Sequence, residues 1–253
     1  MSFSNKVVII TGAGSGIGAA TAISFAKEGA NVVIVGRNEQ KLEKVKEKCA
    51  KSGNGLLVVR ADISNEQDAK KIINETIDKF NKLDVLVNNA GIVGQSSILS
   101  DNVLSSYDTI MNTNLRAVVH ITNLAAPHLI KTKGNIINIS SVAGKMTAIA
   151  GDVALTYAVS KAALDHFTRF VAAELASHGV RVNSISPGPV STGLLDNAVA
   201  SLSMSLEDME RAVPLGRVSE PEEIADLILF LASDKAKAIT GSDYVSDNGL
   251  LLK

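Results

Sequence analysis

Apolar and polar residues follow one another in blocks along the chain. Short runs rich in Val, Ile and Leu recur six times, at residues 6–12, 31–36, 56–60, 84–91, 135–141 and 180–188. Each run is nearly continuous in apolar residues rather than alternating. This pattern predicts short strands that are covered on both faces of a sheet.

The stretches between these runs have helical spacing instead. In residues 64–80 the apolar positions recur every three or four residues. Ser64, followed three residues later by Gln67, is typical of a capping box, so we expect a helix to begin there. Residues 36–53 predict a charged surface helix whose glutamates are spaced to pair with lysines.

Strand and helix alternate over the whole chain. This order predicts a parallel sheet with helices on both faces and right-handed crossovers. The sequence has no linker, low-complexity tract or internal repeat, so we expect one domain over residues 1–253. The predicted fold class is therefore α/β, with a doubly wound parallel β-sheet that binds ligands at the carboxyl ends of its strands.

Composition narrows the functional classes. Of the 253 residues, 46% are hydrophobic, which is enough for a large core, and the net charge of −1 gives no reason to expect nucleic acid or an acidic membrane as partner. No apolar run approaches the roughly 20 residues that cross a bilayer, and we expect no signal peptide. The single cysteine, Cys49, excludes an internal disulfide and suits a reducing compartment, so we expect a cytoplasmic protein.

Metal and serine-hydrolase chemistry find no support in the sequence. Neither His-x-x-x-His nor Cys-x-x-Cys occurs, and the four histidines are scattered at His120, His128, His166 and His178. A G-x-S-x-G elbow is also absent. We therefore expect no metal site and no serine nucleophile.

The first strand ends in the glycine-rich stretch "TGAGSGIG". Gly12, Gly16 and Gly18 follow a strand and open a helix, so the backbone can turn sharply and approach a pyrophosphate at the helix N-terminus. Ile17 occupies the third glycine position of the ordinary G-x-G-x-x-G pattern, and a tight turn without a ligand is the alternative. The position after the first strand of a βαβ unit favours dinucleotide binding.

The end of the second strand, "IVGRN", bears on the choice of dinucleotide. Gly36 stands where a NAD-binding unit usually has a carboxylate for the ribose 2′-hydroxyl, and Arg37 follows. A guanidinium pairs with a 2′-phosphate, which favours NADP(H) and leaves NAD(H) possible. The alternative is that Arg37 is a surface charge near the adenine. Ser15 in the glycine-rich turn is not basic, so a second phosphate partner is missing there.

Tyr157 and Lys161 lie four positions apart in "LTYAVSKAALDHF", on one face of a predicted helix. A free phenol has a pKa near 10. A positive charge about 4 Å away, at an effective dielectric constant of about 20, contributes up to about 4 kcal/mol. At about 1.4 kcal/mol per pKa unit, the tyrosine pKa would fall by about two to three units, into the range of general acid–base catalysis. For an isolated pattern the alternative is a half-buried tyrosine beside a solvated lysine.

Several motifs in a fixed order resemble the short-chain dehydrogenase/reductase family. They are "TGAGSGIG", "NNAG" at 88–91, "MNTNL", "NISS", "YAVSK" and "PGPVST" at 187–192, and the match runs from Lys6 to about Gly249. The resemblance implies a single Rossmann-type domain that binds a nicotinamide dinucleotide. It also implies a NAD(P)-dependent enzyme that oxidises an alcohol or reduces a carbonyl group.

The resemblance further implies a catalytic set of Asn114, Ser141, Tyr157 and Lys161. Ser141 would hydrogen-bond the substrate oxygen as its charge grows. Lys161 would also bind the nicotinamide ribose, and Asn114 would hold a water that links Lys161 to solvent. The loop from Ser141 to Tyr157 is three residues longer than is common in the family, which makes Ser140 a minor rival of Ser141.

Most of the expected cofactor contacts come from the same resemblance. Asp62 would accept from the adenine amine, although capping of the helix near Ser64 is a competing role. The "NNAG" segment would pass behind the adenosine ribose, with Asn88 tying strands together as an alternative. The full expected set is Gly12, Ser15, Gly16, Ile17, Gly18, Arg37, Asn38, Asp62, Ile63, Asn89, Ala90, Gly91, Tyr157, Lys161, Pro187, Gly188, Val190 and Thr192.

In the family, the segment at about 191–215 covers the substrate. Its apolar residues, together with those of other loops, would line the site: Leu194, Leu195, Val199, Leu202, Met204, Met209, Val93, Ile98, Met146 and Ile149. A small lipophilic secondary alcohol or ketone (terpenoid, steroid-like or alicyclic) is the expected substrate, unless these residues only pack the segment.

Two other functions stay open. A 3-oxoacyl thioester reductase would need a basic docking patch, for which only Lys131, Lys133 and Arg169 offer support. A catalytically silent protein that senses a dinucleotide is the alternative outside enzymes. The family resemblance also implies a homotetramer or homodimer.

Overall fold

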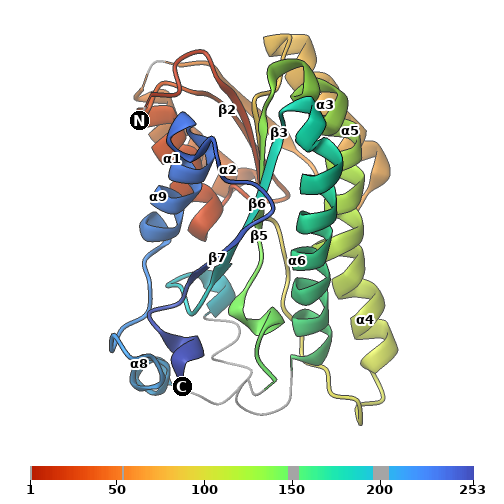
Figure 1. The fold of residues 1–253 in the computed structure, drawn as a ribbon, viewed down its shortest axis with the longest axis vertical. Coiled ribbons are helices and arrows are strands. Elements are labelled where there is room, and N and C mark those ends of the chain that lie inside the picture. The colour runs from red at the N-terminus through yellow and green to blue at the C-terminus, as the bar shows by residue number, and fades with distance from the viewer. Residues whose placement is uncertain (1, 53, 148–153, 196–204) are drawn as a thin grey trace.

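The computed structural model describes residues 2–52, 54–147, 154–195 and 205–253. Its centre is one parallel sheet with the strand order β3-β2-β1-β4-β5-β6-β7 (Figure 1). The strands are β1 (Val7–Thr11), β2 (Asn31–Gly36), β3 (Leu56–Arg60), β4 (Val85–Asn88), β5 (Asn135–Ile139), β6 (Arg181–Pro187) and β7 (Asp243–Ser246). Its larger helices are α1 (Gly16–Lys27), α2 (Glu39–Ala50), α3 (Glu66–Phe80), α4 (Val103–Met111), α5 (Ala117–Thr132), α6 (Leu155–Leu175), α8 (Leu206–Ala212) and α9 (Pro221–Ala232).

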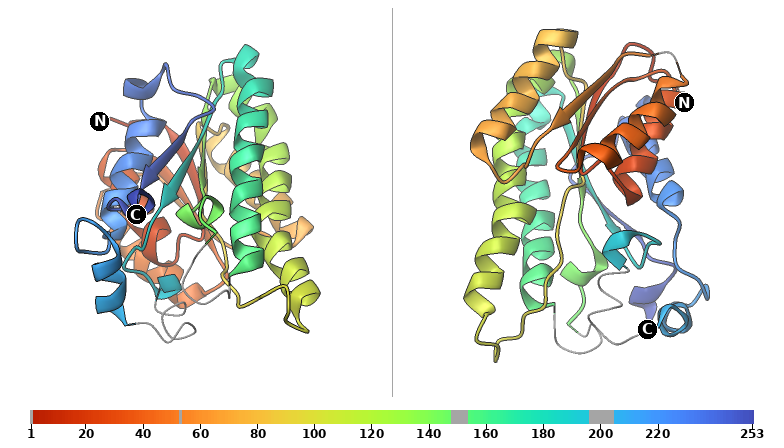
Figure 2. Two further views of the ribbon diagram at one scale, coloured as in Figure 1. Left: turned by 60° about the horizontal axis from the view of Figure 1, so that its bottom comes forward. Right: turned by 180° about the vertical axis from the view of Figure 1, so that it is seen from behind.

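The helices form a layer on each face of the sheet, as Figures 1 and 2 show. Helices α1, α2 and α9 pack together on one face, and α3, α5, α4 and α6 form the layer on the other. Strand β1 pairs with β2 on one side and with β4 on the other. The sheet is therefore doubly wound as predicted, and its switch point lies at the carboxyl end of β1.

The core lies on both sides of the sheet. Every residue of β1, β4 and β5 is buried. Ile10 belongs to the apolar cluster that includes Phe25 of α1, whereas its neighbour Ile9 belongs to the opposite cluster with Ile121 of α5. Because successive side chains of a strand point to opposite faces, coverage of both faces explains why the strand sequences are continuous apolar runs.

Strand β7 was not predicted. It pairs with β6 at the edge of the sheet, and its residues are half-buried or exposed. Only Tyr244 and Val245 in it are apolar, so the run is too short to stand out in the sequence. The six predicted strands are all present within a few residues of their expected bounds.

The predicted cap of helix α3 is wrong by one residue. The side chain of Asn65 accepts hydrogen bonds from the backbone N–H groups of Gln67 and Asp68, so Asn65 is the N-cap. The Ser64 hydroxyl instead donates to Asp62 Oδ1 at 2.7 Å. Asparagine is as good an N-cap as serine, and the backbone conformation decides between adjacent candidates.

We expect Asn65→Ala to lower the free energy of unfolding by about 1 kcal/mol, because two N-terminal N–H groups of α3 lose their acceptor. Urea denaturation measures the change. The control is Asn74→Ala at an exposed position in the middle of the same helix. It removes no cap and replaces a poorer helix former by alanine. Equal losses in the two variants would contradict the assignment of the cap.

Candidate active site

Two adjoining cavities lie at the carboxyl ends of the strands. The first, of about 480 Å³, is formed by the glycine-rich turn after β1, the ends of β2 and β3, and the segment after β4. The second, of about 350 Å³, is formed by the ends of β5 and β6, the start of α6 and the chain around Leu194. Both are lined by Ile17, Asn89, Gly91, Val93, Thr192 and Leu194, so they form one continuous cleft.

The glycine-rich turn is pressed against the segment that follows β4. A Cβ atom on Gly12, whose φ is +66°, would lie 2.9 Å from Ala90 Cα, and one on Gly18 would lie 2.4 Å from the Gly12 oxygen. Ser15 is the N-cap of α1, but its side chain makes no capping hydrogen bond to a described residue. The N–H groups of the first turn are therefore available to an anion. This cradle fits the pyrophosphate of a dinucleotide.

Two basic residues lie where the ribose end of a dinucleotide would be bound. Arg37 follows β2, and Lys41 lies in the first turn of α2; both line the first cavity. A Cβ atom on Gly14 would come within 3.3 Å of Lys41 Cβ, which places this lysine against the glycine-rich turn. Lys41 was not predicted, because a second phosphate partner was expected only inside the glycine-rich turn. Asn38 caps α2 by accepting from the Lys41 N–H group at 2.9 Å.

Asp62 lines the first cavity, where its contact with adenine stays a prediction, but it is not the cap of α3. Its Oδ1 accepts hydrogen bonds from the N–H group and the hydroxyl of Ser64, so it stabilises the turn before α3. Its Oδ2 lies 3.6 Å from Arg37 Nη1, and the residue lines the first cavity with Ile63. Burial opposes ionisation, but the Ser64 hydrogen bonds and the Arg37 charge outweigh it and hold the pKa of Asp62 below its usual range.

Ser141, Tyr157 and Lys161 meet in the second cavity. Ser141 follows β5, and its side chain is close enough to the Tyr157 phenol to lower the phenol pKa. Its Oγ also accepts from the Ala143 N–H group, which caps the short 3-10 helix η2 (Val142–Gly144). Lys161 Nζ donates to the Ile139 carbonyl at 2.8 Å and lies 5.6 Å from the centroid of the Tyr157 ring.

The pKa of Tyr157 shifts in the direction opposite to the one predicted. Burial raises the tyrosine pKa, and the nearby Ser141 side chain offsets only part of that rise. Burial also lowers the pKa of Lys161 to about 8, although the nearby Asp165 carboxylate opposes this. The predicted fall assumed an ammonium about 4 Å from the phenol at an effective dielectric constant of about 20. In the structure the ammonium is bound to a carbonyl, and desolvation of the phenol is the larger effect.

Asn114 lies behind the cavity rather than in its wall. It belongs to a single π-helical turn, η1 (Asn112–Arg116), between α4 and α5, and it is 1% exposed. Its side chain bonds both backbone groups of Ile92 at 2.9 Å and donates to Ser160 Oγ at 3.2 Å. A Cβ atom on Gly91 would lie 3.4 Å from Asn114 Oδ1 and 3.6 Å from Lys161 Nζ, so only Gly91 separates the two.

The rival assignments have structural roles. Ser140 is 3% exposed, and its hydroxyl donates to the Lys161 carbonyl at 3.2 Å. Asn88 Nδ2 donates to Asn138 Oδ1 at 2.8 Å and to Thr122 Oγ1 at 3.2 Å. Asn88 thus ties β4 to β5 and α5, which was its predicted alternative role.

The wall of the second cavity is largely the predicted one. Val93, Met146, Leu194, Leu195 and Met209 line it, as do Pro187, Gly188, Val190 and Thr192 of the "PGPVST" motif. Ile98 does not line it: this residue lies on the loop before α4, and it is 75% exposed. The predicted residues Ile149, Val199, Leu202 and Met204 lie outside the described residues.

Leu250 is a wall residue that the sequence did not reveal. It begins the 3-10 helix η5 (Leu250–Leu252), which Asp247 fixes by accepting from the N–H groups of Gly249 and Leu251. A Cβ atom on Gly188 would lie 2.8 Å from Asp247 Cα, so this segment abuts the turn after β6. No local pattern indicates such a contact, which joins Gly188 to Asp247, 59 positions further along the chain.

None of the helices within the described ranges has the length and apolarity that a membrane crossing requires. Within those ranges there is also no group of three or more His, Cys, Asp or Glu side chains that could hold a metal ion.

Comparison with known proteins identifies the family. Residues 12–251 match the family model described as "Enoyl-(Acyl carrier protein) reductase". The chain is 35% identical over 254 residues to the 3-oxoacyl-(acyl-carrier-protein) reductase FabG of Thermotoga maritima, covering 100% of both chains. It is 36% identical over 250 residues to meso-2,3-butanediol dehydrogenase of Serratia marcescens, covering 98% of this chain and 96% of the relative.

A solved structure agrees in fold and sequence. A short-chain dehydrogenase/reductase of unknown function from Caenorhabditis elegans, crystallised with cofactor, superposes with a TM-score of 0.90 at 41% identity, covering 99% of this chain and 96% of the other. The protein belongs to the short-chain dehydrogenase/reductase family. It is an oxidoreductase that depends on NAD(P).

We expect Gly18→Ala to weaken dinucleotide binding at least about tenfold, because its Cβ would lie 2.4 Å from the Gly12 oxygen and the turn must move. Fluorescence titration with NADPH and NADH measures the affinity. The matched control is Gly14→Ala, whose Cβ meets only the Lys41 side chain, at 3.3 Å, and should cost less. Wild-type affinity in Gly18→Ala would contradict the role of this close contact.

Proposed function

We propose that the enzyme transfers a hydride between the nicotinamide of NADP(H) and a lipophilic secondary alcohol or ketone, with Tyr157 as general acid and base. The observation that carries this proposal is the placement of the phenol and Ser141 in an apolar cavity that opens into the dinucleotide cleft. Among the described residues that line this cavity, Lys161 alone is charged.

The proposed chemistry divides among three side chains. The bound nicotinamide supplies or accepts the hydride. During reduction, the Tyr157 hydroxyl gives its proton to the substrate oxygen, while Ser141 donates a hydrogen bond to the same atom. The Lys161 ammonium stabilises the phenolate that remains.

A raised tyrosine pKa has a directional consequence. The phenol keeps its proton at neutral pH, which suits carbonyl reduction. Alcohol oxidation needs the phenolate, so its rate should rise with pH as the phenol ionises.

The cavity wall supports a lipophilic substrate. Met146 and Met209 offer adaptable apolar surface, and Leu194 and Leu195 extend it. The cations that could have docked a thioester carrier do not border the cavity. Lys133 follows α5 and packs against Gly179. Both residues lie where β5 and β6 begin, whereas the cavity lies at the carboxyl ends of these strands.

A 3-oxoacyl thioester reductase is the second candidate. It is favoured by the description of the matching family model and by the activity named for the Thermotoga relative. The name of the Serratia relative favours a small diol instead. A catalytically silent sensor is disfavoured, because Ser141, Tyr157 and Lys161 are all present and in mutual reach.

The test is NADPH oxidation with a panel of cyclic and terpenoid ketones, a vicinal hydroxyketone and a 3-oxoacyl thioester. We expect turnover of the cyclic ketones and a loss of at least about a hundredfold in Tyr157→Phe, which removes one oxygen and no packing volume. Dinucleotide affinity should stay unchanged. Tyr107→Phe is the matched control, since Tyr107 is exposed on α4. Activity above about a hundredth of wild type in Tyr157→Phe would refute the assignment.

The preference for NADP(H) is supported by charge at the end of β2. The contact of Arg37 with Asp62 is a surface ion pair at 3.6 Å, with 69% of the arginine side chain exposed. Such pairs contribute little, so the guanidinium is free to turn toward a 2′-phosphate. Lys41 adds a second positive charge in the same cavity.

We expect Arg37→Ala to raise the Michaelis constant for NADPH about tenfold to a hundredfold, the loss of about 1.5–3 kcal/mol for a charge-assisted hydrogen bond. Lys41→Ala should act in the same direction, and neither should affect NADH. Lys44→Ala, exposed on the same helix, is the control. Gly36→Asp should favour NADH by repelling the phosphate. A wild type that prefers NADH, with Arg37→Ala indifferent, would show the NADP(H) proposal to be wrong.

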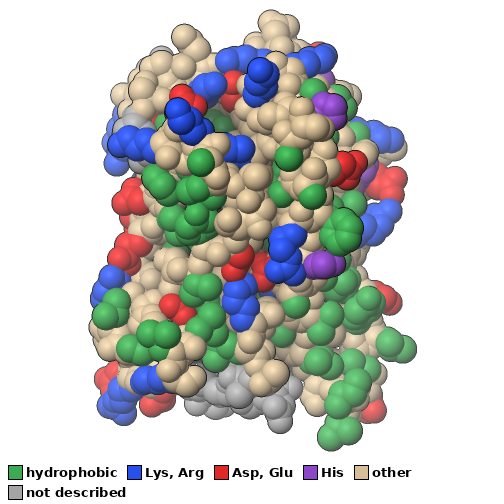
Figure 3. Space-filling model, in the orientation of Figure 1, with side chains coloured by type: hydrophobic (Ala, Val, Ile, Leu, Met, Phe, Trp, Pro, Cys, Tyr) green, Lys and Arg blue, Asp and Glu red, His purple; other side chains and the backbone are tan. Residues whose placement is uncertain are grey.

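Assembly as a homotetramer or homodimer is supported by exposed apolar side chains. Leu104 on α4 is 74% exposed and Phe170 on α6 is 65% exposed. Hydrophobic side chains gather over α4, at the lower right of Figure 3. A cytoplasmic location is supported by Cys49, which is a free thiol.

A further inference from the structure

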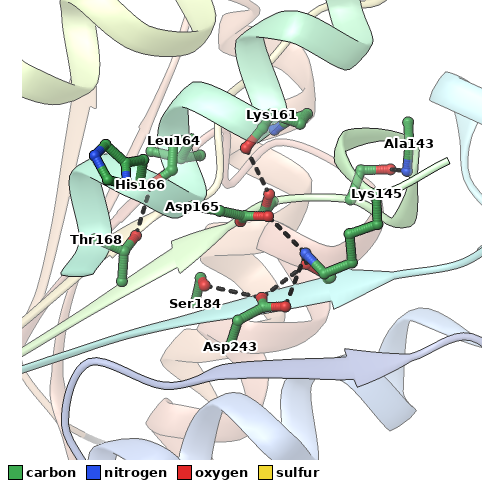
Figure 4. Close-up of polar contacts among 12 residues, drawn as sticks. Ala143, Lys145, Lys161, Leu164, Asp165, His166, Thr168, Ser184 and Asp243 are labelled. Carbon is green, nitrogen blue, oxygen red and sulfur yellow. Dashed lines mark hydrogen bonds and ion pairs between the residues drawn. The ribbon is translucent and has the colours of Figure 1, made fainter. Parts of the chain in front are cut away.

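A partly exposed ion network, drawn in Figure 4, lies beside the segments that carry the catalytic side chains. Its centre is Lys145, four residues after Ser141 and just beyond η2. Lys145 Nζ lies 2.5 Å from Asp165 Oδ2 on α6, 2.8 Å from Asp243 Oδ2 on β7 and 2.9 Å from Ser186 Oγ on β6. One ammonium group therefore fastens the Ser141 segment to three other elements.

Each of these elements supplies part of the second cavity. Helix α6 carries Tyr157 and Lys161, β6 leads into the Pro187–Gly188 turn, and η2 contributes Val142 and Ala143. Strand β7 leads to the segment that ends at Leu250. The lysine thus joins four of the segments that form or lead into the walls of the second cavity.

The packing beside this network leaves no free space. A Cβ atom on Gly144 would lie 2.7 Å from the Ala162 nitrogen and 2.9 Å from the Lys161 carbonyl carbon. The backbone of η2 therefore touches the backbone of α6 at Lys161. The Lys145 bonds hold these two segments together, and with them the Ser141 hydroxyl and the Tyr157 phenol.

The network also sets the charge around Lys161. Asp165 lies one helical turn beyond Lys161 and favours its charged form. Among the described residues, Lys145 is the hydrogen-bond donor to the Asp165 carboxylate, whose other oxygen is buried without a partner. Asp243 is further held by Ser184 and Ser186. The titratable groups facing Lys161 are thus Tyr157 and Asp165 on α6, with Lys145 and Asp243 behind them.

We propose that Lys145 is a positioning residue: it holds Ser141 against Tyr157 and balances the carboxylates of Asp165 and Asp243 behind the catalytic pair. This inference rests on the proposed acid–base role of Tyr157. It assigns a function to a lysine outside the expected catalytic set.

The first test is steady-state kinetics of Lys145→Met, which keeps most of the side-chain stem and removes the charge. A misplacement of about 1 Å can cost about a hundredfold in rate. We therefore expect kcat to fall at least about tenfold, with NADPH affinity unchanged because the glycine-rich turn is not in contact with the network. Lys145→Arg keeps the charge and should restore most of the activity. Lys71→Met, which removes an exposed partner of Glu75 on α3, is the matched control.

The second test needs no substrate. Ionisation of Tyr157 is followed by the ultraviolet absorbance of its phenolate, as the difference between each protein and its Tyr157→Phe counterpart. Lys145→Met leaves the Asp165 charge unbalanced and should move the titration of Tyr157 to higher pH. Asp165→Asn removes that charge and should move it to lower pH. A lysine that only supports folding would give no such opposite shifts.

Opposite titration shifts, together with a loss of kcat that Lys145→Arg repairs, support the proposal. Unchanged kcat in Lys145→Met, or titration shifts that are absent or in one direction, overturn it. If the wild type reduces no compound of the panel, the proposed function fails, and the titration alone decides about Lys145. If Lys145→Met does not fold, the same titration of Lys145→Arg and Asp165→Asn decides. A wild-type midpoint for Tyr157 in Lys145→Arg and a lowered midpoint in Asp165→Asn support the proposal. Unchanged midpoints in both variants overturn it.

Discussion

The parallel pairing of β1 with β4 is the constraint on which the whole site depends. It brings the glycine-rich turn against the segment after β4, where Asn89 Nδ2 donates to the Thr11 carbonyl and Thr11 Oγ1 accepts from the Asn89 N–H group. A side chain at position 12 is excluded from this contact, since a Cβ on Gly12 would lie 2.9 Å from Ala90 Cα. Further along the same segment, Gly91 lies next to the side chains of Lys161 and Asn114. A single strand pairing therefore sets both the dinucleotide cleft and the floor of the second cavity.

Burial of charge is the second constraint. Lys161 lies in an apolar wall, where desolvation alone would favour its neutral form. The Ile139 carbonyl and the charge of Asp165 compensate, and Asp165 in turn is compensated by Lys145. Burial of the Asp165 carboxylate, which is 9% exposed, cancels much of the Coulomb energy of its pair with Lys145, so this chain of contacts contributes little to stability and much to geometry. This agrees with its position between the segments that carry the reacting groups.

The sequence was sufficient for six of the seven strands and for most of the residues that line the two cavities, because those features are local. Continuous apolar runs reflect strands covered on both faces, and each motif occupies one strand end. The features that were missed depend on contacts between distant segments. Lys41 reaches the glycine-rich turn from the next helix, and Leu250 reaches the cavity from residues far along the chain. The pKa of Tyr157 was predicted with the wrong sign because spacing reveals the neighbouring lysine but not the depth of burial.

The position of η5 has a practical consequence for work with this enzyme. Leu250 lines the cavity, and three residues later Lys253 Nζ donates to the Arg211 carbonyl at the end of α8. Phe3 lies at the other end of the molecule, where its N–H group donates to the Glu28 carbonyl, as Figure 1 and the right view of Figure 2 show. A peptide tag attached near Lys253 would therefore lie beside the substrate wall, whereas one attached near Phe3 would lie far from it.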